Sequence, residues 1–189
     1  MTRWSSPLLE WALMLVVSAF LFVEFFRLND YLFSALEHTF TVSWVFLPAG
    51  FRVVLVLLLG APGAFGIALG SYWLNLERFD QSSALFSLTL CLISGFSPWL
   101  VKCFMEQRGQ LDRELKNMGS ASLLQFVLIY AAVNALIHQA LFWASRMGDS
   151  KPWIDVWPMF VGDLVGALLI LYTFKLSLSW FRRLAGHKA

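Results

Sequence analysis

Residues 121–144 read ASLLQFVLIYAAVNALIHQALFWA and contain no aspartate, glutamate, lysine or arginine. A helix of about 20 mostly apolar residues is long enough to cross the hydrocarbon core of a bilayer, so this stretch predicts a membrane-spanning helix. Asn134 and His138 lie four residues apart within it and therefore on one helix face. The stretch thus indicates the fold class, and it also indicates where polar groups enter the membrane.

The rest of the 189-residue chain has the same character. Hydrophobic residues make up 59% of it and charged residues 14%, with a mean hydropathy of +0.68, whereas a soluble domain carries about 25% charged residues. This composition excludes a cytosolic enzyme, a disordered regulator and a secreted module. No run of lysine and arginine indicates nucleic-acid binding. We therefore predict an all-α fold, a polytopic transmembrane helical bundle that forms one domain over residues 1–189 in the lipid bilayer.

Six apolar segments set the predicted topology, at about residues 8–26, 42–59, 64–76, 83–104, 121–144 and 157–180. Between the first two, residues 27–40 predict an interfacial helix or loop. The side that would hold both termini carries Arg3, Lys102, Arg108, Arg113, Lys116, Lys175, Arg182, Arg183 and Lys188, and the opposite side carries Arg27, Arg78, Arg146 and Lys151. Because positive residues favour the cytoplasmic side, we expect both termini in the cytoplasm.

Among the polar residues inside the predicted spans, four form the candidate ligand-binding site: Arg52, Asn134, His138 and Asp163. An ionisable residue inside a span costs about 2.5–3.5 kcal/mol on insertion and is a functional candidate by default. Counted at about 1.5 Å per residue, the three ionisable groups fall in the outer half of the bilayer. We expect them to share a cavity between the second, fifth and sixth spans.

Two interpretations of these residues stay open. Arg52 and Asp163 could neutralise each other as a structural ion pair, and His138 could be a packing residue. Alternatively, Arg52 would bind the anionic group of a small polar or anionic ligand and Asp163 would orient that ligand, because a guanidinium offers a rigid fork of donors. His138 would then make binding depend on pH near neutrality.

Proline and glycine residues surround the candidate site. Pro48 and Gly50 stand just before Arg52, where we expect them to loosen or break the second span. The spacings Gly66-xxx-Gly70 and Gly162-xxx-Gly166 predict close helix contacts, which ordinary packing is sufficient to explain.

No catalytic motif is present. The chain has no H-E-x-x-H, no phosphate-binding glycine loop and no G-x-S-x-G. Cys91 and Cys103 lie about 18 Å apart along one helix, too far for a disulfide, and their spacing is not that of a metal site. We expect no enzymatic activity, no metal and no cofactor.

Three short segments carry a resemblance to a known family. Residues 43–50 (SWVFLPAG), 60–70 (GAPGAFGIALG) and 157–166 (WPMFVGDLVG) resemble the bacterial membrane-associated sensor domain family, first type, and the likeness covers about residues 40–175. The matching residues are Pro48, Gly50, Gly162, Asp163 and Gly166. The resemblance implies a multi-pass sensory module of the bacterial inner membrane. Members usually precede a histidine kinase, diguanylate cyclase or phosphodiesterase domain and commonly have about eight spans.

Since no output domain follows Lys188, we expect a stand-alone sensor that signals through a separate membrane or cytoplasmic protein. A transport role is the alternative, because six spans in about 190 residues also match the substrate-binding subunits of energy-coupling-factor vitamin transporters. Those subunits carry small-xxx-small patterns on the first span. In this chain the corresponding pattern, Ala131-xxx-Ala135, lies on the fifth predicted span, so transport ranks below sensing. A membrane assembly subunit without a small ligand is the third possibility.

The predicted topology is tested with reporter fusions. A reporter placed after Lys188 should be active as a cytoplasmic protein, and one inserted near Asp149 should be active as a periplasmic protein, because the positive residues gather on the side of the termini. A periplasmic carboxyl terminus would contradict the six-span topology.

Overall fold

The computed structural model describes residues 6–39, 42–78, 84–115, 118–145 and 151–186. In chain order the elements are α1 (Pro7–Phe33), the 3-10 turn η1 (Ser34–Leu36), β1 (Glu37–Thr39), β2 (Val42–Ser43), α2 (Leu47–Leu59), α3 (Ala61–Arg78), α4 (Ala84–Gln107), α5 (Ser120–Ala144) and α6 (Pro152–Gly186). The two short strands pair antiparallel. Because 87% of the described residues are helical, the predicted all-α class is confirmed.

Four of the described helices are long and apolar enough to cross a membrane: α1 continued through η1, α4, α5 and Pro152–Trp180 of α6. These helices support a membrane protein. The other two are α2, an apolar helix of 13 residues, and α3, which has 18. At about 1.5 Å per residue, α2 rises about 20 Å and is shorter than the hydrocarbon core of about 30 Å. A crossing by α2 or α3 stays a prediction, as does the cytoplasmic placement of the termini.

The largest correction to the predicted elements concerns the second span. It was expected over residues 42–59, but Val42 and Ser43 form β2 and the helix begins only at Leu47. Pro48 does not break this helix, because it lies in the first turn, where the absent N–H is not needed and the fixed φ suits the helix. Asn29 of α1 satisfies the first backbone N–H of α2, because its side-chain oxygen accepts a 2.9 Å hydrogen bond from the Leu47 N–H.

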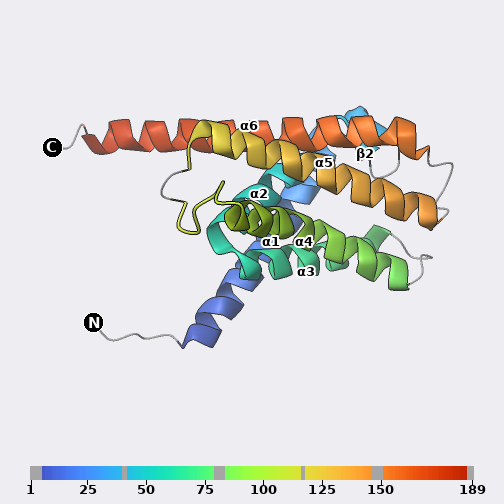
Figure 1. Ribbon diagram of the computed structural model, residues 1–189, viewed down its shortest axis with the longest axis horizontal. Helices are drawn as coiled ribbons and strands as arrows, with labels where there is room; N and C mark the ends of the chain where they lie inside the picture. The colour runs from blue at the N-terminus through green and yellow to red at the C-terminus, as the bar shows by residue number, and fades with distance from the viewer. Residues whose placement is uncertain (1–5, 40–41, 79–83, 116–117, 146–150, 187–189) are drawn as a thin grey trace.

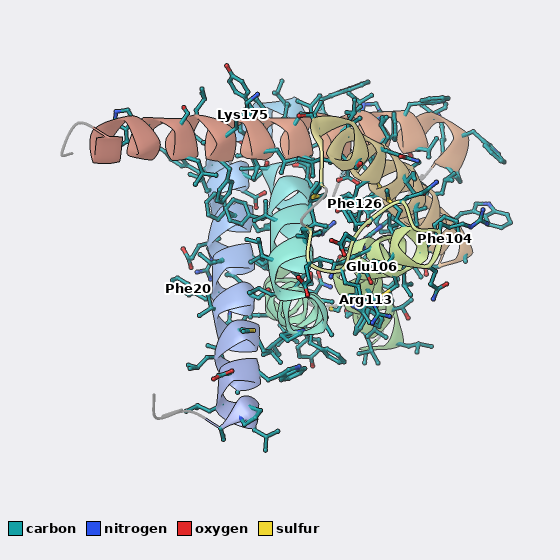
Figure 2. The ribbon with its side chains drawn as sticks, turned by 60° about the vertical axis from the view of Figure 1, so that its left-hand side comes forward. Phe20, Phe104, Glu106, Arg113, Phe126 and Lys175 are labelled. Carbon is teal, nitrogen blue, oxygen red and sulfur yellow. The ribbon has the colours of Figure 1, made fainter. Side chains whose placement is uncertain are left out.

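The helix α2 lies at the centre of the fold. It packs against α1, α3, α4 and α6, and ten of its 13 residues are buried. Figure 1 shows α5 and α6 side by side along one edge, with α3 and α4 on the other side of α2. Figure 2 shows α1 running crosswise to α6, so the helices do not form a parallel bundle. A helix too short to cross a bilayer alone is thus enclosed by protein.

Two hydrophobic clusters meet at α2. Its Ala49, Val53 and Leu57 pack with residues of α4, α5 and α6, whereas Phe51 and Leu55 pack with residues of α1 and α3. Each set repeats every four residues and therefore follows one helix face. Together, the two faces join α2 to both halves of the molecule.

Close backbone contacts hold α6 against the start of α2. A Cβ atom on Gly162 would meet the carbonyl oxygen of Ser43, and one on Gly166 would meet that of Phe46. The Phe46 N–H also donates a 3.1 Å hydrogen bond to the Gly162 carbonyl. Similarly, Gly66 of α3 lies against α1 at the Leu15 carbonyl. The predicted helix contact at Gly66 and Gly70 is confirmed, whereas Gly162 and Gly166 make their close contacts with β2 and the start of α2.

We expect Gly166→Ser to lower the stability of the protein. The new side chain would overlap the Phe46 carbonyl, and overpacking of a tight contact costs about 1–3 kcal/mol. The matched control is Gly119→Ser, because Gly119 has nothing within 4 Å of its Cβ position and precedes α5 as its N-cap, where serine is favoured. Thermal unfolding in detergent measures both, and equal midpoints would contradict the contact.

Candidate functional site

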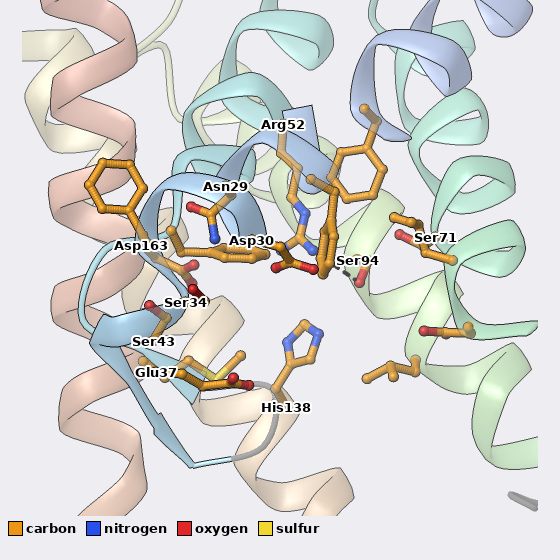
Figure 3. A pocket seen from close by; sticks show the side chains of 18 of the residues that line it. Asn29, Asp30, Ser34, Glu37, Ser43, Arg52, Ser71, Ser94, His138 and Asp163 are labelled. Atoms are coloured by element: carbon orange, nitrogen blue, oxygen red, sulfur yellow. Dashed lines mark hydrogen bonds between the residues drawn. The ribbon is translucent and has the colours of Figure 1, made fainter. Parts of the chain in front are cut away.

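A cavity of about 240 Å³ lies inside the bundle and is lined by Arg52, His138 and Asp163 (Figure 3). Its other polar lining comes from α1 (Asn29, Asp30), η1 and the strands (Ser34, Glu37, Ser43), α3 (Ser71, Asn75) and α4 (Ser94). Five phenylalanines, Phe22, Phe26, Phe33, Phe46 and Phe142, complete the wall. The cavity is therefore polar at several points within an otherwise apolar bundle.

Arg52 is buried on α2, with 4% of its surface exposed. Its Nη1 donates to the Tyr130 hydroxyl at 3.5 Å and its Nη2 to Ser94 Oγ at 3.3 Å. The guanidinium carbon also lies 5.2 Å and 5.3 Å from the ring centres of Phe22 and Phe46, within the range of cation–π attraction. The Nε atom is buried and has no hydrogen-bond partner among the described residues. Two of the five guanidinium donors thus have described partners.

Asp163 is held by a relay of side chains from α4 and α5. Its Oδ2 accepts a 2.6 Å hydrogen bond from Asn134 Nδ2, and Asn134 Oδ1 accepts a 3.0 Å bond from Ser97 Oγ. Both Asn134 and Asp163 are almost fully buried. Because the amide contacts a carboxylate on one side and a hydroxyl on the other, its orientation is fixed.

His138 is buried and lines the cavity. Its Nδ1 lies 2.9 Å from the Asn134 carbonyl oxygen. A carbonyl only accepts hydrogen bonds, so Nδ1 carries the proton of this bond. In the neutral ring Nε2 is then a hydrogen-bond acceptor. A role for His138 in ligand binding stays a prediction.

The structure corrects the direct ion pair that was one interpretation of Arg52 and Asp163. No contact within 4.0 Å joins the two side chains in the described part of the chain. Each is instead hydrogen-bonded to neutral groups, Arg52 to Tyr130 and Ser94, and Asp163 to Asn134. Opposite charges thus face one cavity without neutralising each other by contact.

Of the four candidate residues predicted from the sequence, Arg52, His138 and Asp163 line the cavity. Asn134 lies fully buried behind it, bonded to Asp163 and His138. The predicted boundary of the cavity was too narrow. It was expected between the second, fifth and sixth spans, whereas α1, η1, the strands, α3 and α4 also line it. Asp30 and Glu37 were assigned to an interfacial segment, and Ser71, Ser94 and Tyr130 were not singled out. Small hydroxyls in an apolar helix give little signal in a sequence, because they also occur in plain helix packing.

The motif residues of the predicted site have a positioning role. Gly50 of α2 lies against the Gly166 carbonyl and Ile170 of α6, and Pro48 is fully buried at the start of the same helix. Together with Gly162, these residues let α2 and α6 approach closely. The approach places Arg52 and Asp163 around one space. Among the described residues, no three histidine, cysteine, aspartate or glutamate side chains are grouped so as to hold a metal ion.

Comparisons of this chain with protein-family models, with curated proteins and with solved structures find no match. The resemblance to the bacterial sensor family accordingly stays a prediction carried by residues 43–50, 60–70 and 157–166. Function is inferred from the groups that line the cavity.

We expect Arg52→Gln and Asp163→Asn to be coupled in their effect on stability. Each single change leaves the opposite charge buried and should cost on the order of 3 kcal/mol, whereas the double variant should recover part of the loss. The measurement is the free energy of unfolding in detergent for all four proteins.

The matched control is the exposed pair of Arg27 and Glu24, which are 3.2 Å apart on α1. Its double variant, Arg27→Gln with Glu24→Gln, should show a coupling of at most about 0.5 kcal/mol. If losses at Arg52 and Asp163 simply add, the two charges do not act on each other across the cavity.

Proposed function

We propose that this chain is an integral membrane sensory module that binds a small polar or anionic ligand in the Arg52 cavity and signals through a separate partner protein. The observation that carries the proposal is that Arg52, His138 and Asp163 line one cavity, in which Arg52 and Asp163 are not joined by a direct ion pair among the described residues. A charge removed from water is costly unless its surroundings compensate for it. A ligand whose groups pair with these side chains would lower that cost, so the cavity favours an occupant.

The cavity has the properties of a ligand site. Ligand pockets are mostly apolar and have a few polar groups that fix orientation; here phenylalanine rings surround Arg52, His138 and Asp163. Its volume of about 240 Å³ is below the roughly 300–1,000 Å³ typical of pockets for drug-sized molecules. A small metabolite therefore suits it better than a lipid or a peptide.

A packed route leads from the cavity toward the predicted cytoplasmic loop. Tyr130, which accepts the Arg52 hydrogen bond, belongs to the same hydrophobic cluster as Met105 and Leu111. The partly buried Leu115 packs against this cluster and precedes α5 in the polar segment 105–120. A ligand that draws Arg52 away from Tyr130 would thus disturb the packing beneath this segment. That segment is the proposed contact for the partner.

A small-solute transport component is the second candidate, and the segment between α1 and α2 favours it. Its described residues, 34–39 and 42–46, contain no α-helix, and Ser34, Glu37, Ser43 and Phe46 line the cavity. Backbone without helix at membrane depth is tolerated where it borders protein or a cavity, and discontinuous helices form the binding sites of many transporters. Uptake of bound ligand into proteoliposomes made from the purified chain would favour transport over sensing.

Ligand binding is tested by thermal unfolding of the purified protein in detergent. Organic acids, inorganic phosphate, amino acids and sugars are screened at millimolar concentration. We expect at least one compound to raise the unfolding midpoint by several degrees, because a ligand at 100 times its Kd adds about 2.7 kcal/mol. Arg52→Gln should abolish the shift.

The matched control is Arg113→Gln, because Arg113 is exposed in the polar segment far along the chain from the cavity residues. This variant should keep the full shift. If no compound shifts the wild-type protein, or if both variants respond equally, the cavity is a structural feature and not a ligand site.

A further inference from the structure

We infer that the ligand of this cavity is a small zwitterion, with an anionic group at Arg52 and a protonated amine facing Asp163 and His138. The inference rests on the proposed function and narrows it, since a simple anion would satisfy only one part of the cavity. Figure 3 shows the Arg52 side chain pointing toward the His138 ring, with Asp163 to one side. We call the part of the lining at Arg52 its first end and the part at His138 and Asp163 its second end; the two differ in their hydrogen-bonding groups.

At the first end, Arg52 supplies donors only. A guanidinium has five N–H donors and no acceptor, and the described partners Tyr130 and Ser94 accept one hydrogen bond each from Nη1 and Nη2. A ligand group that bonds to this side chain has to be an acceptor. A carboxylate or phosphate is the strongest choice, because its hydrogen bonds to a guanidinium are assisted by charge.

At the second end, the cavity supplies acceptors. His138 Nδ1 is committed to the Asn134 carbonyl, which makes Nε2 of the neutral ring an acceptor. A carboxylate has about four lone-pair sites, and Asn134 is the only described hydrogen-bond donor to Asp163 in the residues that the structure covers. Both side chains can therefore accept further hydrogen bonds from an occupant. A protonated amine has several donors and also carries the charge that opposes Asp163.

The charge of the lining points the same way. The titratable lining consists of the carboxyl groups of Asp30, Glu37 and Asp163, the guanidinium of Arg52 and the His138 ring. Of these carboxyl groups, Asp163 is buried and has no direct ion pair with Arg52 among the described residues. An anion without a positive group would leave this carboxylate without an opposite charge in a medium of low polarity, where charges interact strongly. A zwitterion adds no net charge and pairs each of its groups with an opposite one.

The aromatic side chains of the cavity wall indicate what the uncharged part of the ligand is. Phe22 and Phe46 flank the guanidinium, and Phe142 lies beside His138, with a distance of 6.2 Å between the ring centres. An apolar substituent on the ligand would pack against these rings. The chemistry that fits is an amine and an anionic group on a short carbon skeleton, as in an amino acid or an aminoalkyl phosphate.

The experiment measures binding to the wild-type chain in detergent by thermal shift and calorimetry. The zwitterionic probes are the 20 standard amino acids, γ-aminobutyrate and phosphoethanolamine, and the anionic probes are succinate and inorganic phosphate. For the zwitterion that binds best, two derivatives are then compared: its N-acetyl form, which lacks the cation, and its amide or ester, which lacks the anion. We expect each derivative to bind at least tenfold more weakly than the parent.

Two variants assign the ends of the ligand. Asp163→Asn should weaken binding of the parent zwitterion at least tenfold, yet change binding of the N-acetyl form, which lacks the cation, less than twofold. Arg52→Gln should likewise weaken the parent at least tenfold, yet change binding of the amide or ester, which lacks the anion, less than twofold. Arg113→Gln is the unchanged control. Because the derivatives are tested on the wild-type chain, a variant that fails to fold does not remove the test.

The outcomes separate the two proposals. Binding of succinate or phosphate without binding of any zwitterion would overturn the zwitterion and leave the ligand-binding module in place. An N-acetyl form that binds as tightly as its parent would have the same consequence. If no zwitterion or anion binds while sugars do, the zwitterion fails alone. A complete lack of binding to the wild-type protein would overturn both.

Discussion

The burial of the Arg52 guanidinium is the constraint on which the centre of this protein depends. A charge removed from water is costly unless its surroundings compensate for it, and here two aromatic rings and two hydroxyl groups from α4 and α5 surround it. Those groups come from different helices, so α2 has to lie where all of them reach it. The enclosure of ten of its residues follows from that central position.

Small residues make the central position possible. Without side chains at Gly162 and Gly166, the carbonyl groups of Ser43 and Phe46 lie directly on α6, and Asn29 of α1 satisfies the first N–H of α2. The start of α2 is thus fixed from two sides, by a hydrogen bond from one helix and by backbone contact with another. Since Asp163 lies next to Gly162, the same contact that fixes α2 also places the carboxylate across the cavity from Arg52.

The cavity combines two features that rarely occur together in an apolar bundle. Its charged groups are individually held by neutral partners, as in the relay from Ser97 through Asn134 to Asp163, yet Arg52 and Asp163 are not paired with each other. Removing either charge alone would leave the other uncompensated in the interior. Sensing and transport both require a site of this kind, and they differ in what the surrounding helices do after binding.

The sequence by itself determined the all-α fold class and the polar positions inside apolar segments. Long runs without charge, such as residues 121–144, restrict the chain to helices, and the cost of Arg52, Asn134, His138 and Asp163 in such runs marks them as a group. It also predicted the close contacts at Gly162 and Gly166. Tertiary structure alone decided that Arg52 bonds to Tyr130 and Ser94 instead of Asp163, and that Asp30 and Glu37 join the cavity. The reason is physical: spacing along a helix fixes which residues share a face, whereas the partners of that face depend on how separate helices cross.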